Sequence, residues 1–257
     1  MRIGNRDAAR FRAWRGIPER TAPRGRCEMT DDSQRVAEEI AGRLRQLQGC
    51  KTPEIRAMRR EFSKRLKTAP AGEVMGIAEK LLSSPGNHHR VVAYELIYHH
   101  EPALSQVTAR NLERLGRGIS SWDQTDVFGI FLAGPAWNQR QVPDGMIHKW
   151  ARSNDRWWRR AALVATVALN SKSRGGRGDA RRTLQVCRML ESDRDPMVVK
   201  ALSWAMRVLA KVEPKAVQRY VTERGPALAA LVRREVRNKL TTGLKNPRRR
   251  SPAGREL

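Results

Sequence analysis

The segment SWDQTD, which begins at Ser121, places a tryptophan and an aspartate where they could act together. Trp122 and Asp126 are four residues apart, so on a helix they share one face. An indole ring and a carboxylate both attract positive charge, so this face could stabilise a cation. Asp123 has a local explanation: Ser121 and Gln124 form a capping-box pattern, and a helix that starts there favours an acid in its first turn. Asp126 lies beyond that turn and needs another explanation.

The two aspartates lie in a chain that is strongly basic. It has 51 Lys and Arg against 26 Asp and Glu, a formal net charge of +25 and a pI ≈ 11.4. Both ends are basic, but most of the excess lies between them, so the basic surface belongs to the folded part. Such an excess predicts a polyanionic partner, and we expect nucleic acid rather than membrane.

Composition also limits the class of protein. With 40% hydrophobic residues the chain can build a core, and it has no run of about 18 apolar residues. The basic N-terminus is not followed by an apolar signal region, so we expect a cytoplasmic protein that associates with the bacterial nucleoid through DNA. The cysteines, Cys27, Cys50 and Cys187, are scattered without CxxC spacing, which indicates reduced structural thiols.

Helical periodicity dominates the chain, and strand-like alternation is nearly absent. Four segments resemble one another: RVVAYELI, TDVFGIFL, RAALVATV and KALSWAMR, which start at residues 90, 125, 160 and 200. This spacing is typical of HEAT or armadillo repeats, and it predicts an all-α solenoid with a concave basic cleft. An irregular helical bundle is the alternative. Pro and Gly, including Gly134-Pro135, are expected to separate the helices.

The two ends differ from the middle of the chain. Residues 1–28 are rich in Arg without persistent periodicity and are expected to form a disordered arm, and residues 245–257 form a second basic tail. Residues 29–244 are the expected helical-repeat domain. Translation could instead begin at Met29, in which case the arm is not part of the protein.

The histidines do not form a metal site in the sequence. His88-His89 and His99-His100 are eleven residues apart, or roughly 16 Å on a helix, and His148 stands alone. No phosphate-binding GxxxxGK[ST] loop or recognisable nucleophile is present either. We therefore expect neither a metal nor an organic cofactor.

Tryptophan and arginine gather in the later repeats. A single helical tryptophan is most often a core residue, but tryptophan beside arginine in a very basic protein also suits a nucleic-acid groove, where indoles stack on bases and guanidinium groups hold phosphates. The residues concerned are Trp157, Trp158, Arg156, Arg159, Arg160, Trp204 and Arg207.

Four segments between about residue 33 and about residue 240 resemble the AlkD-like DNA alkylpurine glycosylases, which are built on HEAT-like repeats. GCKTPEIRAMRREF is similar to a Gly-x-x-x-Pro-x-x-Arg segment of that family, and SWDQTD to its Trp-Asp-x-x-Asp motif. RWWRRAAL is similar to its Trp-x-x-Arg-Ala-Ala helix, and KALSWAMRVLAKVEPKAV to its Ala-x-x-Trp-x-x-Arg helix. The four occur in the order of the family. The first helix departs from it, because it lacks an aromatic that some relatives direct into the cleft.

The resemblance implies roles for particular residues. Trp122 and Asp126 match the family's catalytic tryptophan and aspartate, Arg160 matches a cleft arginine, and Trp204 matches a second cleft tryptophan. We therefore expect Trp122, Asp126 and Trp204 to be catalytic. We expect Arg160 to hold a phosphate and to bind DNA together with four further candidates, Arg156, Trp157, Arg159 and Arg207. A purine alkylated at N3 or N7 is a cationic leaving group, so an enzyme mainly has to stabilise the positive charge that forms on the sugar. The indoles and the Asp126 carboxylate suit that task.

We therefore expect a monomeric, monofunctional DNA glycosylase that hydrolyses the N-glycosidic bond of cationic alkylated purines in double-stranded DNA. One alternative is a non-catalytic helical-repeat protein of the same fold that binds nucleic acid. Another is a structural protein whose basic face docks on RNA or the ribosome.

Overall fold

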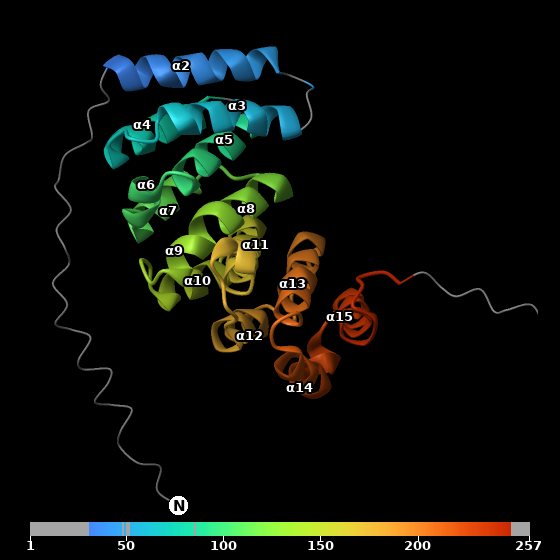
Figure 1. The fold of residues 1–257 in the computed structure, drawn as a ribbon. Helices are drawn as coiled ribbons and strands as arrows, with labels where there is room; N and C mark the ends of the chain where they lie inside the picture. The colour runs from blue at the N-terminus through green and yellow to red at the C-terminus, as the bar shows by residue number, and fades with distance from the viewer. Residues whose placement is uncertain (1–30, 48, 50–51, 85, 248–257) are drawn as a thin grey trace, which may run out of the picture.

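The computed structural model describes residues 31–47, 49, 52–84 and 86–247. The predicted arm, residues 248–257 of the predicted tail, Cys27 and Cys50 lie outside this part of the chain. Within it every regular element is helical and no strand occurs (Figure 1). The prediction of an all-α helical solenoid is confirmed.

The helices form two rows. In the inner row each helix packs on the next. It contains α5 (Asn87–Tyr98), α8 (Trp122–Phe128), α11 (Arg156–Leu169), α13 (Pro196–Leu209) and α15 (Ala230–Thr242). The first four carry the four similar sequence segments, which identifies those segments as successive repeats and excludes the irregular bundle. Figure 1 shows the inner row running from α5 down to α13 and then to α15.

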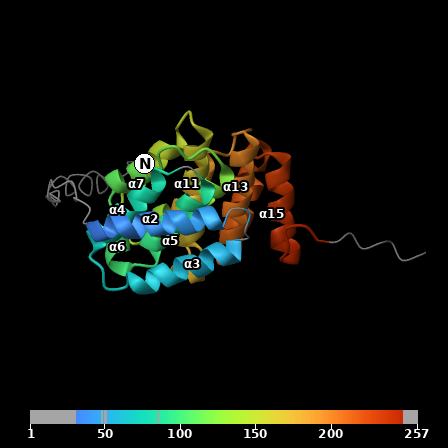
Figure 2. The same ribbon diagram turned by 90° about the horizontal axis from the view of Figure 1, so that it is seen from above.

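The remaining helices precede or cover the inner row. Figure 2 shows α2 and α3 side by side with α5 at the N-terminal end of the stack. The outer row continues through α10, α12 and α14, which also contact one another in sequence. The bounds of these helices are α2 (Asp31–Gln46), α3 (Thr52–Arg65), α4 (Ala71–Leu82), α6 (Glu101–Ser105), α7 (Ala109–Leu115), α10 (Asp144–Ala151), α12 (Ala180–Met189) and α14 (Pro214–Arg224).

Helix α11 is the centre of the stack. Every residue from Arg160 to Leu169 is buried, because the helix contacts α8, α10, α12 and α13 on different sides. Its alanines keep the neighbouring helices close, while Leu163 and Val164 each contribute about 1.5–3 kcal/mol by leaving water. Cys187 of α12 is a buried free thiol, as predicted, and burial raises its pKa to about 12.

Helix α8 starts where the sequence predicted, with Ser121 at its N-cap and Trp122 as its first residue. The predicted capping box is wrong. The Ser121 hydroxyl donates to the Asp123 carboxylate, and the Gln124 side chain accepts from the Ser120 N–H instead of the Ser121 N–H. The Ser121 side chain accepts no hydrogen bond from the first N–H groups of α8, so neither half of the predicted capping box forms.

The predicted break at Gly134-Pro135 is also wrong. Helix α8 continues through a π-helical segment, η2 (Gly129–Ala133), into α9 (Gly134–Asn138). The Gly134 N–H donates to the carbonyl of Gly129, five residues back, and this wider turn leads into Pro135, which has no N–H to place.

The two glycines of this π-helical segment allow it to pack closely against α11. A Cβ on Gly129 would lie 2.6 Å from Val164, and one on Gly134 would lie 2.5 Å from the Cβ of Ala168. Both neighbours belong to α11. The glycines therefore permit the close approach of α8, η2 and α9 to α11 on which the inner row depends.

We predict that Gly134→Ala lowers the free energy of unfolding by about 1–3 kcal/mol, because the added methyl overpacks the contact with α11. Urea denaturation measures the change. Gly145→Ala is the matched control: Gly145 lies in α10 with no atom within 4 Å of an added Cβ, so alanine should be neutral or slightly stabilising. Equal stability of the two variants would show that the close approach does not matter.

Candidate active site

Asp126 and Arg160 form a bidentate ion pair between α8 and α11. Arg160 Nε donates to Asp126 Oδ1 at 2.9 Å, and Arg160 Nη2 donates to Asp126 Oδ2 at 2.8 Å. The third nitrogen, Nη1, donates to the backbone carbonyl of Met197 at 2.5 Å. Met197 lies in the first turn of α13, so one guanidinium joins three successive helices of the inner row.

This pair is largely removed from water. Arg160 is 5% exposed, and the Asp126 side chain is 15% exposed. Burial is the largest influence on Asp126 and raises the pKa of its carboxyl above the usual value; Arg160 opposes the rise, and the negative charge of Asp123 adds to it. A carboxylate with few waters around it attracts a nearby cation more strongly than an exposed one does.

Trp122 lies one helical turn before Asp126, as the spacing predicted. Its indole is 55% exposed, which makes it one of two exposed large apolar side chains in the described part of the chain. An aromatic ring left in water next to a dehydrated carboxylate is available to a ligand, so Trp122 and Asp126 together can contact a cationic group.

Trp204 occupies a different part of the inner row. It is half-buried, packs against the core, and lines a hollow of about 510 Å³ with Ile130 and Val167. It follows Met197 by seven residues, or about 10 Å along α13. The structure therefore brings Trp122 and Asp126 together, with Trp204 about two helical turns beyond the ion pair.

Sequence reasoning missed the basic residues of this hollow. Lys172, Arg174 and Lys211 line it together with Trp204. Lys211 could have been found, because it continues the helical spacing of Trp204 and Arg207. Arg174 could not, because its guanidinium carbon lies 4.2 Å from the ring centroid of Phe131, a contact between distant segments.

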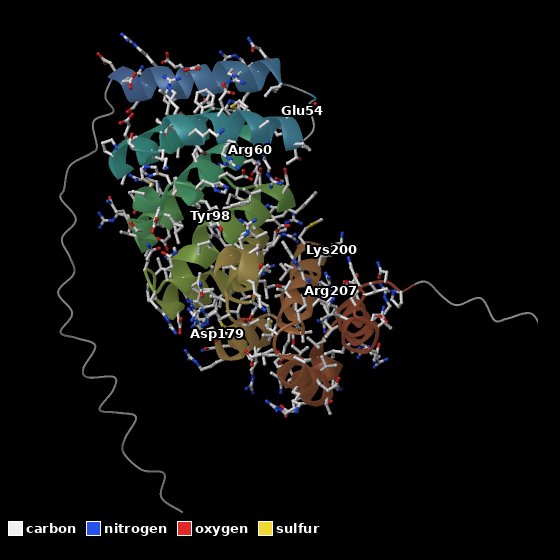
Figure 3. The ribbon with its side chains drawn as sticks, viewed as in Figure 1. Glu54, Arg60, Tyr98, Asp179, Lys200 and Arg207 are labelled. Carbon is white, nitrogen blue, oxygen red and sulfur yellow. The ribbon has the colours of Figure 1, made fainter. Side chains whose placement is uncertain are left out.

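The arginines predicted to bind DNA mostly have acidic partners. Arg159 pairs with Asp193 at 2.8 Å. Arg207 lies 3.5 Å from Glu235 and its side chain is 17% exposed. Figure 3 shows Arg207 and Lys200 on α13.

Arg156 is the most open of these arginines. Its side chain is 54% exposed, 3.4 Å from Asp195, and its guanidinium lies over the ring of Trp157 at 5.5 Å. Arg156 and Trp157 are therefore better placed to meet a ligand than Arg159 or Arg160.

The described residues contain neither a candidate metal site nor a candidate membrane span. No group of three or more His, Cys, Asp or Glu side chains there could hold a metal ion. No helix in the same part of the chain has the length and apolar character needed to cross a membrane.

A comparison of the sequence with known families identifies the family of this chain. A family model described as DNA alkylation repair enzyme matches residues 33–240, which includes Trp122, Asp126, Arg160 and Trp204. The chain belongs to the DNA alkylation repair enzyme family. A search of curated proteins gave no match. The excess of Lys and Arg suits a DNA alkylation repair enzyme, because DNA is a polyanion that basic side chains attract.

We predict that Arg160→Met raises the pKa of Asp126 further, because the two influences that lower it are removed while burial and Asp123 remain. Carbon NMR titration of the Asp126 carboxyl measures the shift. Arg159→Met is the control, since Arg159 pairs with Asp193 and should leave the pKa of Asp126 unchanged. An unchanged pKa in Arg160→Met would show that the ion pair does not form in solution.

Proposed function

We propose that the protein is a monofunctional DNA glycosylase that releases cationic N3- or N7-alkylated purines from duplex DNA. The observation that carries this proposal is the largely buried carboxylate of Asp126, one helical turn after the exposed indole of Trp122 on α8. Membership of the DNA alkylation repair enzyme family supports a damaged-DNA substrate.

The reaction requires the protein to stabilise a cation. An alkylated purine with a positive charge leaves as a neutral base and takes the electron pair of the N-glycosidic bond. Positive charge develops on the deoxyribose, water adds to C1′, and the proton of that water passes to solvent, which leaves an abasic site. Because the leaving group is already activated, the main task of the enzyme is to stabilise the sugar cation.

Asp126 has the charge and the fixed position for this task. Its carboxylate attracts the developing cation and orients the attacking water, and its low exposure strengthens both effects. The bidentate contact with Arg160 holds the carboxylate in one orientation before the substrate arrives, so no energy is spent on ordering it during the reaction.

Arg160 is then a positioning residue. The sequence led us to expect a phosphate contact, but all three guanidinium nitrogens already donate to Asp126 and Met197, and the residue is almost fully buried. More exposed cations such as Arg156 are better placed to bind the DNA phosphates.

The two tryptophans contribute to binding the sugar and the lesion. Trp122 supplies cation–π attraction from its exposed ring beside the carboxylate. Trp204 lines its hollow with Lys172 and Lys211, about two helical turns beyond the ion pair, where it can contact DNA on one side of the lesion.

One observation favours a second candidate, a non-catalytic nucleic-acid binding protein of the same fold. Both oxygens of Asp126 accept hydrogen bonds from Arg160, as they would in a purely structural ion pair. Substitution of Asp126 separates the two candidates.

We further propose that the protein acts as a monomer within the cytoplasm, associated with the nucleoid through DNA. Residues 29–244 would form the domain that binds DNA and carries the activity, between the two basic ends. The strong excess of Lys and Arg supports the DNA association.

We predict that Asp126→Asn slows base release by about a hundredfold or more, because a neutral amide cannot stabilise the sugar cation. Single-turnover assays on duplex DNA methylated at purine N3 or N7 measure the rate. They are run well below the melting temperature of the variant, because breaking a buried ion pair also lowers the stability of the protein. Affinity for undamaged duplex should stay level or rise, because a negative charge is lost.

Asp123→Asn is the control for this variant. Asp123 lies in the first turn of α8, so its loss should cost a few tenths of a kcal/mol in stability and little in rate. Should both variants release base as fast as the unmodified protein, the non-catalytic binding protein becomes the better account.

We predict that Trp204→Ala reduces excision or lesion binding more than it reduces thermal stability, because the indole is half-buried and faces a hollow. Trp137→Ala is the comparison, since Trp137 is fully buried in the core and its loss should cost about 3–5 kcal/mol. A melting temperature of Trp204→Ala as low as that of Trp137→Ala, with normal excision per folded molecule, would assign Trp204 to the core.

A further inference from the structure

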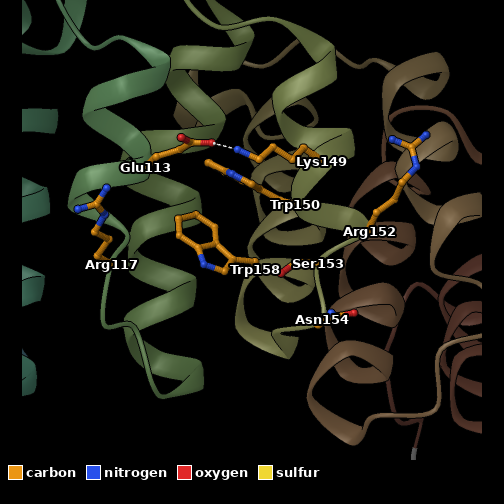
Figure 4. Close-up of a pocket in the computed structure, with 8 residues that line it drawn as sticks. All are labelled: Glu113, Arg117, Lys149, Trp150, Arg152, Ser153, Asn154 and Trp158. Carbon is orange, nitrogen blue, oxygen red and sulfur yellow. Dashed lines mark hydrogen bonds and ion pairs between the residues drawn. The ribbon is translucent and has the colours of Figure 1, made fainter.

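A second hollow lies between α7, α10 and α11, with a volume of about 700 Å³ (Figure 4). We call it the α7–α11 hollow. Arg117, Lys149 and Arg152 contribute cations to its lining, and Trp150 and Trp158 contribute indoles. Its volume is in the range of sites that bind small organic ligands or single nucleotides.

The α7–α11 hollow is separate from the candidate active site. Trp158 and Arg160 are two residues apart on α11, which places their side chains on nearly opposite sides of the helix. Arg160 points to Asp126 and α13, whereas Trp158 points to α7 and α10. A ligand of the hollow therefore needs no contact with Asp126.

The aromatic part of the hollow is held rigidly. The ring centroid of Trp158 lies 4.8 Å from that of Trp150 and 6.0 Å from that of Phe128. The ring also lies against Gly116, where a Cβ would be only 2.5 Å from the Trp158 ring. Trp158 remains partly exposed, so it offers a fixed aromatic surface with little freedom to lose on binding.

The charges of the hollow are not balanced. Lys149 pairs with Glu113 at 2.7 Å, a contact drawn in Figure 4. Arg117 and Arg152 are exposed, and within the described residues neither is in an ion pair with a carboxylate. Figure 4 shows the two guanidinium groups on opposite sides of the indoles.

We propose that the α7–α11 hollow binds an unpaired segment of a DNA strand. One base stacks on Trp158, and the phosphates on its two sides contact Arg117 and Arg152. Indole faces accept any base, and guanidinium groups hold phosphates, which is the combination used to bind single strands. Asn154, which also lines the hollow, can hydrogen-bond the edge of the stacked base. The proposal does not depend on glycosylase activity.

Fluorescence anisotropy with a labelled hexadeoxyadenylate tests the two arginines. Arg117→Gln/Arg152→Gln should weaken binding by about tenfold or more. The control, Arg188→Gln/Arg219→Gln, removes the same charge from exposed positions of α12 and α14 and should have a much smaller effect. An equal loss in the two double variants would mean that only overall charge matters and would overturn the proposal.

The role of the indole is tested with a second probe. The unmodified protein should bind hexadeoxyadenylate about tenfold more tightly than a strand of the same length in which abasic residues replace every deoxyadenosine. Trp158→Leu, which keeps an apolar side chain against Gly116, should lose most of this preference, with melting measured to verify the fold. A preference for bases as large as that of the unmodified protein would overturn the assignment to Trp158.

Competition with a mononucleotide shows whether the α7–α11 hollow binds a DNA strand or a free nucleotide. Deoxyadenosine monophosphate offers one phosphate, so it should bind far more weakly than hexadeoxyadenylate and compete poorly with it in the same assay. Competition at similar concentrations would identify the α7–α11 hollow as a site for free nucleotides and would contradict the proposed strand.

Discussion

The bidentate contact between Asp126 and Arg160 is the interaction on which the inner row and the proposed chemistry both depend. One guanidinium joins α8 to α11 through Asp126 and reaches α13 through the carbonyl of Met197. Arg160 is almost fully buried, so its positive charge needs the Asp126 carboxylate as a partner. The same contact holds the carboxylate in the orientation that the proposed reaction uses. The approach of α8 to α11 that makes the contact possible is permitted by Gly129 and Gly134.

Much of the fold could be predicted from the sequence because each repeat carries its own apolar face. The four similar segments fall on α5, α8, α11 and α13, and their spacing indicates the stacked rows. The helix that continues through Gly134-Pro135 could not be predicted. Gly and Pro usually end helices, and only contact with Val164 and Ala168 of a distant segment explains why these glycines stay helical.

The site was predictable where it rests on local spacing. Trp122 and Asp126 share a helix face because they are four residues apart. The partner of Asp126 was not evident, since Arg160 lies 34 residues away in the sequence and pairs through the packing of two helices. The same packing buries Arg160, which is why a residue expected to hold phosphate is better assigned to positioning. Trp204 shares the inner row with the pair but lines a hollow to which neither Asp126 nor Arg160 contributes.

We propose that this DNA alkylation repair enzyme uses Asp126 to stabilise a sugar cation while the alkylated base leaves. The most direct measurement is a chemical balance on duplex DNA methylated at purine N3 or N7 after incubation with the purified protein. If Asp126 acts in this way, we expect free methylated purine and abasic sites in equal amounts. DNA that is bound but keeps its methylated bases, or bases that lose their methyl groups while remaining attached to the sugar, would contradict it.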